Sequence, residues 1–270
     1  MSDYNRVLLT GAAGALGTQL RQSGQKLGKI VRLSARNACK DLEAHEEDFP
    51  ADLSDFDAVS NAVKGCDAII HMGGQGVEAA WNTILNANIV GSYNIYEAAR
   101  QHGVKRIVYA SSVHAIGYYE RHETIDGNVP TRPDSLYGVS KTFVENLARY
   151  YFDKFGIETV SLRIGSSFPE PTDRRHLITW LSYNDCRQLV EKSLSAERVG
   201  FMVAYGMSDN SRAFWDNRTA ASLGYAPQDS ADDYADKVFA ATKQGDPNDP
   251  AVRYQGGSFV AAGHFEDKKK

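Results

Sequence analysis

This chain of 270 residues has few cysteines and no long apolar run. Its three cysteines, Cys39, Cys66 and Cys186, lie far apart and outside any CxxC or histidine-flanked pattern, so no metal site is expected. No apolar run reaches the roughly 20 residues that cross a bilayer. The N-terminal MSDYNR lacks the basic start and apolar stretch of a secretory signal. These absences predict a protein of the reducing cytoplasm.

A strong charge of either sign is also missing. Lys and Arg total 30 against 34 Asp and Glu, a formal net charge of -4, so neither nucleic acid nor a membrane is expected as a partner. A small-molecule substrate fits better. The 42% hydrophobic content is sufficient for a sizeable core. We also expect a homo-oligomer, because symmetric assemblies are common among soluble enzymes.

Short apolar runs alternate with amphipathic stretches from Arg6 to about Ile164. This alternation predicts βα units and hence an α/β fold, a Rossmann doubly wound parallel sheet with a small C-terminal substrate-binding lobe. Residues 1–165 are expected to form the dinucleotide-binding core. Residues 166–270 are expected to form the substrate-binding lobe and the last strand, packed with the core as one globular unit. The expected strands are residues 7–9, 30–33, 47–49, 68–71, 107–110, 159–164 and 201–205.

The amphipathic stretches predict crossover helices at residues 55–63, 84–102 and 137–155, with a later helix at 183–194. Pro169 and Pro171 indicate a loop after the sixth strand. The closing run Lys268–Lys270 is interpreted as a solvated tail rather than a binding patch.

The run TGAAGALG follows the first strand directly and opens a helix. Gly11, Gly14 and Gly17 would let backbone amides approach a pyrophosphate closely, and Ala15 and Leu16 share that loop. Three glycines alone are weak evidence, because turns also use them. Their position immediately after a strand favours dinucleotide binding.

The second strand ends at Ala35, where NAD enzymes usually carry an acid that binds the ribose hydroxyls. Arg36 follows, and its guanidinium could pair with the 2′-phosphate of NADP or simply lie in solvent. After the third strand, Asp52 and Leu53 are placed to meet the adenine. Asp52 could equally cap the next helix.

Tyr137 and Lys141 lie four residues apart in the segment YGVSK, hence on one helix face. A fixed ammonium favours the phenolate, so we expect Lys141 to lower the pKa of Tyr137 and make it the catalytic base. Lys141 would also hold a ribose hydroxyl of the cofactor. Ser112 is the expected second donor to the reacting oxygen, and Ser111 better fits a turn cap. Asn88 would either anchor a water relay to Lys141 or satisfy a distorted helix turn.

These motifs occur in the order TGAAGALG, HMGG, ANIVGSYN, ASSVHAIG and YGVSK, and together they resemble the extended short-chain dehydrogenase/reductase family. RPDSLYGVSK, YFDKFGIETVSLRIGSSFPEP, FWDN and DPNDPAVRYQGGSFV extend the resemblance to the uronate dehydrogenases over essentially the whole chain. The resemblance implies oxidation of an aldohexuronate, galacturonate or glucuronate, at its anomeric carbon to an aldarolactone with NAD.

The resemblance also implies site residues. They are Tyr137, Lys141 and Ser112 for catalysis, Gly73, Gly74, Asn88 and Ile164 for the cofactor, and Ser166 and Arg175 for the substrate. Arg175 would clamp the uronate carboxylate, since a guanidinium pairs bidentately with that group. His114 is either a substrate contact or a structural histidine.

The chain departs from that family in three places. Arg36 after Ala35 favours NADP over the usual NAD. Val113 and Gly76 stand where the family often has Asn and Ser, which removes polar contacts. Two other functions share the fold: a nucleotide-sugar epimerase or dehydratase, for which the roughly hundred residues after Ile164 are few, and an NAD(P)-sensing regulator, which would typically lack the Tyr/Lys pair.

Overall fold

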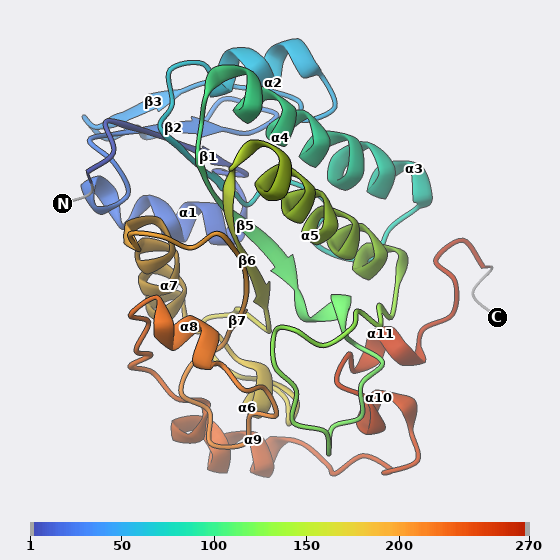
Figure 1. Ribbon diagram of the computed structural model, residues 1–270. Helices are drawn as coiled ribbons and strands as arrows, with labels where there is room; N and C mark the ends of the chain where they lie inside the picture. The colour runs from blue at the N-terminus through green and yellow to red at the C-terminus, as the bar shows by residue number, and fades with distance from the viewer. Residues whose placement is uncertain (1–2, 268–270) are drawn as a thin grey trace.

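A parallel sheet of seven strands organises the computed structural model, which describes residues 3–267 (Figure 1). The run Lys268–Lys270 lies outside the described residues. The strands follow the order β3-β2-β1-β4-β5-β6-β7, and every neighbouring pair is parallel. The expected fold class is therefore confirmed. The strands are β1 (Arg6–Thr10), β2 (Ile30–Ser34), β3 (Glu46–Asp48), β4 (Ala68–His71), β5 (Arg106–Ser112), β6 (Glu158–Ile164) and β7 (Phe201–Gly206).

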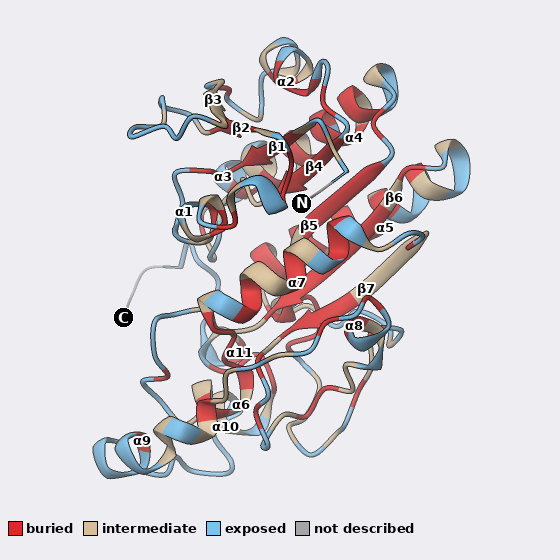
Figure 2. Ribbon diagram, turned by 90° about the vertical axis from the view of Figure 1, so that its left-hand side faces the viewer, coloured by how far each residue is buried: buried red, intermediate tan, exposed pale blue. Residues whose placement is uncertain are grey.

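Helices cover both faces of the sheet, as strands buried on two sides require. One face packs against α1 (Ala15–Arg21) and α7 (Tyr183–Ser195), and its core includes Leu20 and Leu189. The other face packs against α2 (Phe56–Val63), α4 (Gly91–His102) and α5 (Leu136–Phe155). Figure 2 shows the central strands almost wholly buried between these two layers.

The crossover between β4 and β5 is less regular than the expected single helix. It consists of α3 (Trp81–Ile84), a π-helical turn (Leu85–Val90) and then α4. Such wide turns are often found at functional sites.

The C-terminal part of the chain contributes both to the sheet and to a smaller lobe. β7 and α7 pack in the sheet layers, whereas short helices gather beyond the carboxyl ends of the strands (Figure 1). These helices are α6 (His176–Thr179), α8 (Arg218–Ser222), α9 (Ala235–Ala241), α10 (Pro250–Arg253) and α11 (Ser258–Ala261). Short 3-10 turns occur at Gly24–Lys26, Val113–Ala115 and Ala231–Tyr234.

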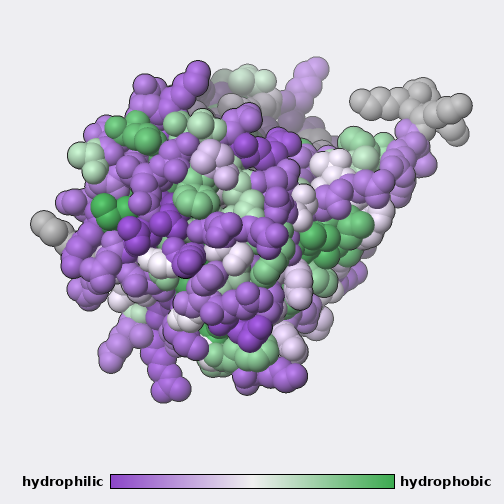
Figure 3. All heavy atoms as spheres, turned by 90° about the horizontal axis from the view of Figure 1, so that it is seen from above, coloured by the Kyte–Doolittle hydropathy of each residue, from purple (hydrophilic) through white to green (hydrophobic). Residues whose placement is uncertain are grey.

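The strand order reverses at β1, which has β2 on one side and β4 on the other. In open α/β sheets the carboxyl ends at such a reversal leave a crevice where ligands bind. Seen from above, the surface is mainly hydrophilic, with small hydrophobic patches (Figure 3). Among the described residues, no helix is both long and apolar enough to span a bilayer.

Candidate functional site

A cavity of about 630 Å³ opens at the strand-order reversal, at the carboxyl ends of β1, β2 and β4. Its walls come from the glycine loop, the loops after β2, β3 and β4, and the start of the α3 crossover. The lining residues are Gly11, Ala13, Gly14, Ser34, Ala35, Arg36, Asn37, Ala51, Asp52, Leu53, Ser54, Gly73, Gly74, Gln75, Asn82, Thr83, Asn86 and Ala87.

Eight of the expected cofactor residues lie together in this cavity: Gly11, Gly14, Ala35, Arg36, Asp52, Leu53, Gly73 and Gly74. The other expected cofactor residues do not line it. Ala15 and Leu16 begin helix α1, and Ile164 is buried in the core at the end of β6. Gly17, Asn88 and Lys141 do not line the cavity either, and the contacts that each of them makes are described below.

The glycine loop is shaped by close backbone contacts. Gly11 has a φ of +67°, and a Cβ there would lie 2.8 Å from the backbone nitrogen of Gly73. A Cβ on Gly17 would lie 2.1 Å from the carbonyl oxygen of Gly11, so Gly17 allows α1 to pack on the loop. Glycine at these positions keeps the cradle narrow and free of side chains, which fits a dinucleotide pyrophosphate.

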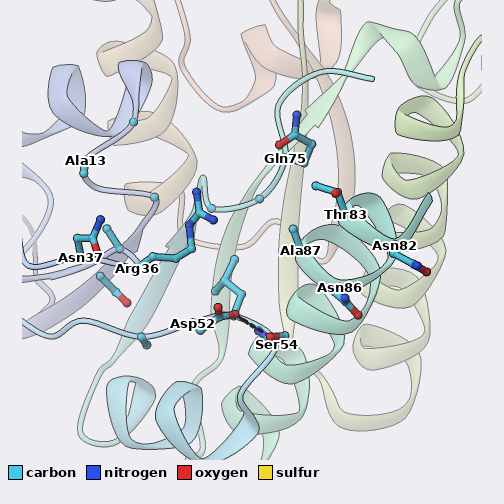
Figure 4. Close-up of a pocket in the computed structure, with 18 residues that line it drawn as sticks. Ala13, Arg36, Asn37, Asp52, Ser54, Gln75, Asn82, Thr83, Asn86 and Ala87 are labelled. Carbon is cyan, nitrogen blue, oxygen red and sulfur yellow. Dashed lines mark hydrogen bonds between the residues drawn. The ribbon is translucent and has the colours of Figure 1, made fainter. Parts of the chain in front are cut away.

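Polar side chains face one another across the cavity. Figure 4 shows Arg36, Asn37 and Asp52 on one side and Asn82, Thr83 and Asn86 on the other. No acid stands at the end of β2, because Ser34 and Ala35 precede Arg36 there. The wall that meets an adenosine ribose in related folds is therefore basic in this chain.

The Asp52 side chain closes a local turn and does not cap a helix. Its Oδ1 accepts hydrogen bonds from the backbone nitrogen and the hydroxyl of Ser54, at 2.8 and 2.7 Å. These bonds lower the pKa of Asp52. The N-cap of α2 is Asp55, which accepts from Ala58 N, so the interpretation of Asp52 as that cap is wrong.

Sequence reasoning missed the far wall of the cavity. Asn82 and Asn86 lie four residues apart, and Thr83 and Ala87 repeat that spacing, so all four share one face of α3 and the π-helical turn. A helix face made of small and polar residues, next to the apolar Trp81 and Ile84, was the sequence signal that could have indicated this wall. Asn37, Ser54 and Gln75 were also missed, and as single loop residues they gave no periodic signal.

The predicted catalytic group comes from two neighbouring elements. Tyr137 and Lys141 lie on the first turns of α5, and the Lys141 Nζ is 5.3 Å from the centroid of the Tyr137 ring. Lys141 Nζ donates a hydrogen bond to Ala110 O at 2.7 Å. Ser112 ends β5, and its side chain is close enough to the Tyr137 phenol to lower the pKa of that group. The expected grouping of phenol, ammonium and hydroxyl is present, and all three residues are buried.

The pKa of Tyr137 does not follow the expected direction. Burial raises the pKa of Tyr137 to about 12, although the neighbouring Ser112 hydroxyl acts to lower it. Burial lowers the pKa of Lys141 to about 8, and Glu145 acts in the opposite direction. The expectation that Lys141 brings the phenol toward neutral pH is wrong for this geometry, because the ammonium donates to Ala110 O and burial of the phenol dominates.

Of the two serines at the end of β5, Ser112 and not Ser111 caps the turn that follows. Ser112 caps the 3-10 turn Val113–Ala115, since its oxygen accepts from His114 N at 3.2 Å. Ser111 donates to Glu145 Oε1 at 2.6 Å. The interpretation of Ser111 as the turn cap is therefore wrong.

Asn88 lies in the π-helical turn, so the helix around it is distorted as expected. Its side chain accepts from Gln75 N at 2.7 Å and donates to Gln75 O and to Ser140 Oγ, at 3.1 and 2.9 Å. Ser140 Oγ in turn donates to Tyr137 O at 2.7 Å. Asn88 therefore connects the cavity loop to the first turn of α5, and its partners do not include Lys141.

Arg175 lies at the N-terminus of α6 and is held on two sides. Its Nε donates to Gln255 O at 3.0 Å, and its Nη1 donates to Ser166 Oγ at 3.3 Å. Its Nη2 is inaccessible to solvent and has no hydrogen-bond partner among the described residues. Burial lowers the pKa of Arg175 to about 10. The structure thus brings together Ser166 and Arg175, two of the residues expected to contact substrate.

His114 is anchored beside the phenol. Its Nδ1 lies 2.7 Å from Asp134 Oδ2, and its ring stacks on Phe259 with centroids 3.9 Å apart. The ring centroid is 5.8 Å from that of Tyr137. The 3-10 turn after β5, helix α5 and helix α11 therefore meet at one place.

Comparison with known proteins agrees with this geometry. The profile described as the NAD dependent epimerase/dehydratase family matches residues 7–186. The chain belongs to this family. A uronate dehydrogenase of Pseudomonas syringae pv. tomato is 53% identical over 98% of this chain and 96% of its own length.

Solved structures show the same relation. A glucuronic acid dehydrogenase from Chromohalobacter salexigens has a TM-score of 0.95 at 51% identity, covering 98% of this chain and 100% of its own. A tyrosine-to-alanine variant of uronate dehydrogenase from Agrobacterium tumefaciens, complexed with NAD, has a TM-score of 0.93 at 46% identity, covering 97% and 99%. The resemblance predicted from the motifs is confirmed, and the chain is a member of an NAD-dependent enzyme family.

Val113 and Gly76, the two other departures from the family pattern, lie in different surroundings in this chain. Val113 is buried in an apolar cluster with Ile116 and Trp215. Gly76 lies in the loop after β4, and a Cβ there would meet nothing within 4 Å. A serine side chain would fit at position 76 without displacing any described atom.

Proposed function

We propose that this chain oxidises aldohexuronates, galacturonate or glucuronate, at the anomeric carbon to aldarolactones. The observation that carries the proposal is the similarity, near half identity over almost the entire length, to proteins named uronate or glucuronic acid dehydrogenase. Residues 1–165 would bind the cofactor, and residues 166–270 would supply the substrate lobe. The homo-oligomer and the compartment expected from the sequence stay predictions.

In this proposal Tyr137 is the base. The phenolate removes the proton of the anomeric hydroxyl while Ser112 donates a hydrogen bond to the same oxygen. NAD, when bound, supplies the acceptor for the hydride that leaves the anomeric carbon. Lys141 lies beside the phenol, with its Nζ 5.3 Å from the centroid of the Tyr137 ring, and would hold a ribose hydroxyl of the cofactor.

Arg175 is the proposed clamp for the uronate carboxylate. Two of its nitrogens are fixed by Gln255 O and Ser166 Oγ, which leaves the buried Nη2 as a donor aimed by its neighbours. A buried donor without a partner is costly, and a carboxylate oxygen would satisfy it. Neutral aldoses lack that oxygen, so the site would discriminate against them.

For the cofactor we propose that Arg36 favours NADP in this chain. Arg36 reaches into the cavity beside Asn37 and follows Ala35, the position where an acid would repel a 2′-phosphate (Figure 4). The variant Arg36→Ala is expected to raise the KM for NADP by about ten- to a hundredfold, because a hydrogen-bonded charge pair contributes roughly 1.5–3 kcal/mol. The KM for NAD should change little. Equal changes in both KM values would contradict this preference.

The direct test is an initial-rate assay at 340 nm with galacturonate and with glucuronate, each with NAD and with NADP. The proposal expects reduction of the cofactor with at least one uronate and none with glucose or galactose at equal concentration. Absence of any absorbance change with both uronates would contradict it. Tight binding of a nucleotide sugar would then favour the epimerase or dehydratase alternative, and cofactor binding alone would favour the regulator.

A further inference from the structure

One face of α5 contacts the last three residues of β5. Tyr137, Lys141 and Glu145 follow one another at four-residue spacing along that face. The first lies beside Ser112, the second donates to Ala110 O at 2.7 Å, and the third accepts from Ser111 Oγ at 2.6 Å. The catalytic function proposed above uses the first two contacts and leaves the third unexplained.

The third contact is part of a buried ion pair. Glu145 Oε1 and Oε2 accept from Arg163 Nε and Nη2, at 3.0 and 2.9 Å, and Arg163 lies on β6. Glu145 is 4% exposed and Arg163 is 2% exposed. Burying both charges costs several kcal/mol of desolvation, and an apolar pair of similar volume is often as stable. The pair is therefore poorly explained by stability alone.

Its position suggests what it does. Glu145 joins α5, β5 and β6, with one oxygen shared between Ser111 and Arg163. Ser111 adjoins Ser112, and Glu145 lies one helical turn beyond Lys141. A shift of α5 along β5 would therefore break the Glu145 contacts and, at the same time, separate Tyr137 from Ser112.

We propose that Glu145 is a positioning residue: paired with Arg163, it fixes the register of α5 on β5 so that Tyr137 and Lys141 stay aligned with Ser112. This inference rests on the proposed dehydrogenase function. It assigns a role in turnover to a residue that would touch neither substrate nor cofactor.

A second effect follows from charge. The groups that face Lys141 are Tyr137 and Glu145 on α5, Tyr109 on β5 with its ring centroid 5.0 Å away, and His71 on β4. Of these, Glu145 is the one that raises the pKa of Lys141. Removing its charge lowers that pKa, so the ammonium is lost at a lower pH.

The test compares Glu145→Gln with Glu158→Gln. Glu158 pairs with Arg106 at 2.7 Å and also joins β5 to β6, but at their opposite ends. Both variants should lower the melting temperature. We expect Glu145→Gln alone to lower kcat by about ten- to a hundredfold, the scale of a misplaced catalytic group. It should also move the alkaline limb of the kcat profile to lower pH, with the KM for the cofactor unchanged.

A double variant guards against loss of folding. Glu145→Gln combined with Arg163→Met leaves no uncompensated buried charge, so stability should recover while kcat stays low. Recovery of kcat together with stability would overturn the inference, as would a Glu145→Gln profile that matches that of Glu158→Gln. If the unmodified protein reduces neither cofactor with any uronate, the proposed function fails first, and that result is separate from the variant comparison.

Discussion

Arg175, the proposed carboxylate clamp, is held in place by its own neighbours. Two neighbours hold its guanidinium, and the nitrogen that remains has no partner among the described residues. Its pKa is lowered to about 10 by burial, so it is still charged at neutral pH. A buried positive charge in this state is stabilised by a carboxylate.

The variant Arg175→Lys should lower kcat/KM for galacturonate by about ten- to a hundredfold, because an ammonium cannot form the bidentate pair. The measurement is the initial rate over a range of uronate concentrations. Arg174→Lys is the control, since Arg174 donates to Thr242 O and lies over the Phe239 ring instead. An equal loss in both variants would show that the clamp has been assigned to the wrong residue.

At the scale of elements, α5 is fixed at its start by a side chain from the loop after β4. Glu78 Oε2 accepts from Tyr137 N at 2.7 Å, and its Oε1 accepts from Leu136 N at 3.3 Å. Asn88 and Ser140 engage the Tyr137 carbonyl side of the same turn. The loop after β4, which lines the cavity, therefore also fixes the start of the helix that carries the Tyr137 phenol.

Replacing Glu78 by Ala should lower the free energy of unfolding by about 1 kcal/mol, the usual cost of a lost N-terminal cap. It should also lower kcat, because the backbone of Tyr137 loses its partner. Urea unfolding and steady-state assays measure the two effects. Asp55→Ala removes the cap of α2, far from the phenol, and should lower stability alone. A Glu78 variant with normal kcat would contradict the coupling.

The central strands could be predicted from the sequence because they are short apolar runs buried on both faces, and the observed bounds differ by a residue or two. β5 is the exception that matters, since it continues through Ser111 and Ser112, whose polarity ended the predicted run. The contact of Ser111 with Glu145 depends on residues 34 positions apart and could not be foreseen locally. The π-helical turn was likewise hidden, because helical periodicity does not distinguish it from α-helix.

At the scale of the whole molecule, a buried histidine links the centre of the sheet to acid stability. His71 is fully buried, with Nδ1 2.8 Å from Thr10 Oγ1 and Nε2 3.0 Å from Ser92 Oγ. Burial lowers its pKa to about 3. The unfolded chain binds a proton at this residue below about pH 6.5 while the folded chain does not, so stability falls as the pH drops from 6.5 toward 3.

This linkage predicts that the unmodified protein loses about 2 kcal/mol of unfolding free energy between pH 6.5 and pH 5 through His71. In His71→Gln that part of the loss should disappear, whatever the stability at pH 7.5. Urea unfolding at pH 7.5, 6.5 and 5 measures the free energy of unfolding of each protein. His122→Gln is the control, since the His122 side chain is 76% exposed. A similar pH dependence in both variants would rule out His71 as the cause.

The central claim of the proposed function is that the phenol of Tyr137 is the base of the reaction. The most direct measurement is turnover of Tyr137→Phe with galacturonate at 340 nm, beside cofactor binding followed by fluorescence. The account predicts a fall in kcat of about a hundred- to ten-thousandfold with unchanged cofactor affinity, the scale of a lost general base. Normal turnover by the phenylalanine variant would contradict it.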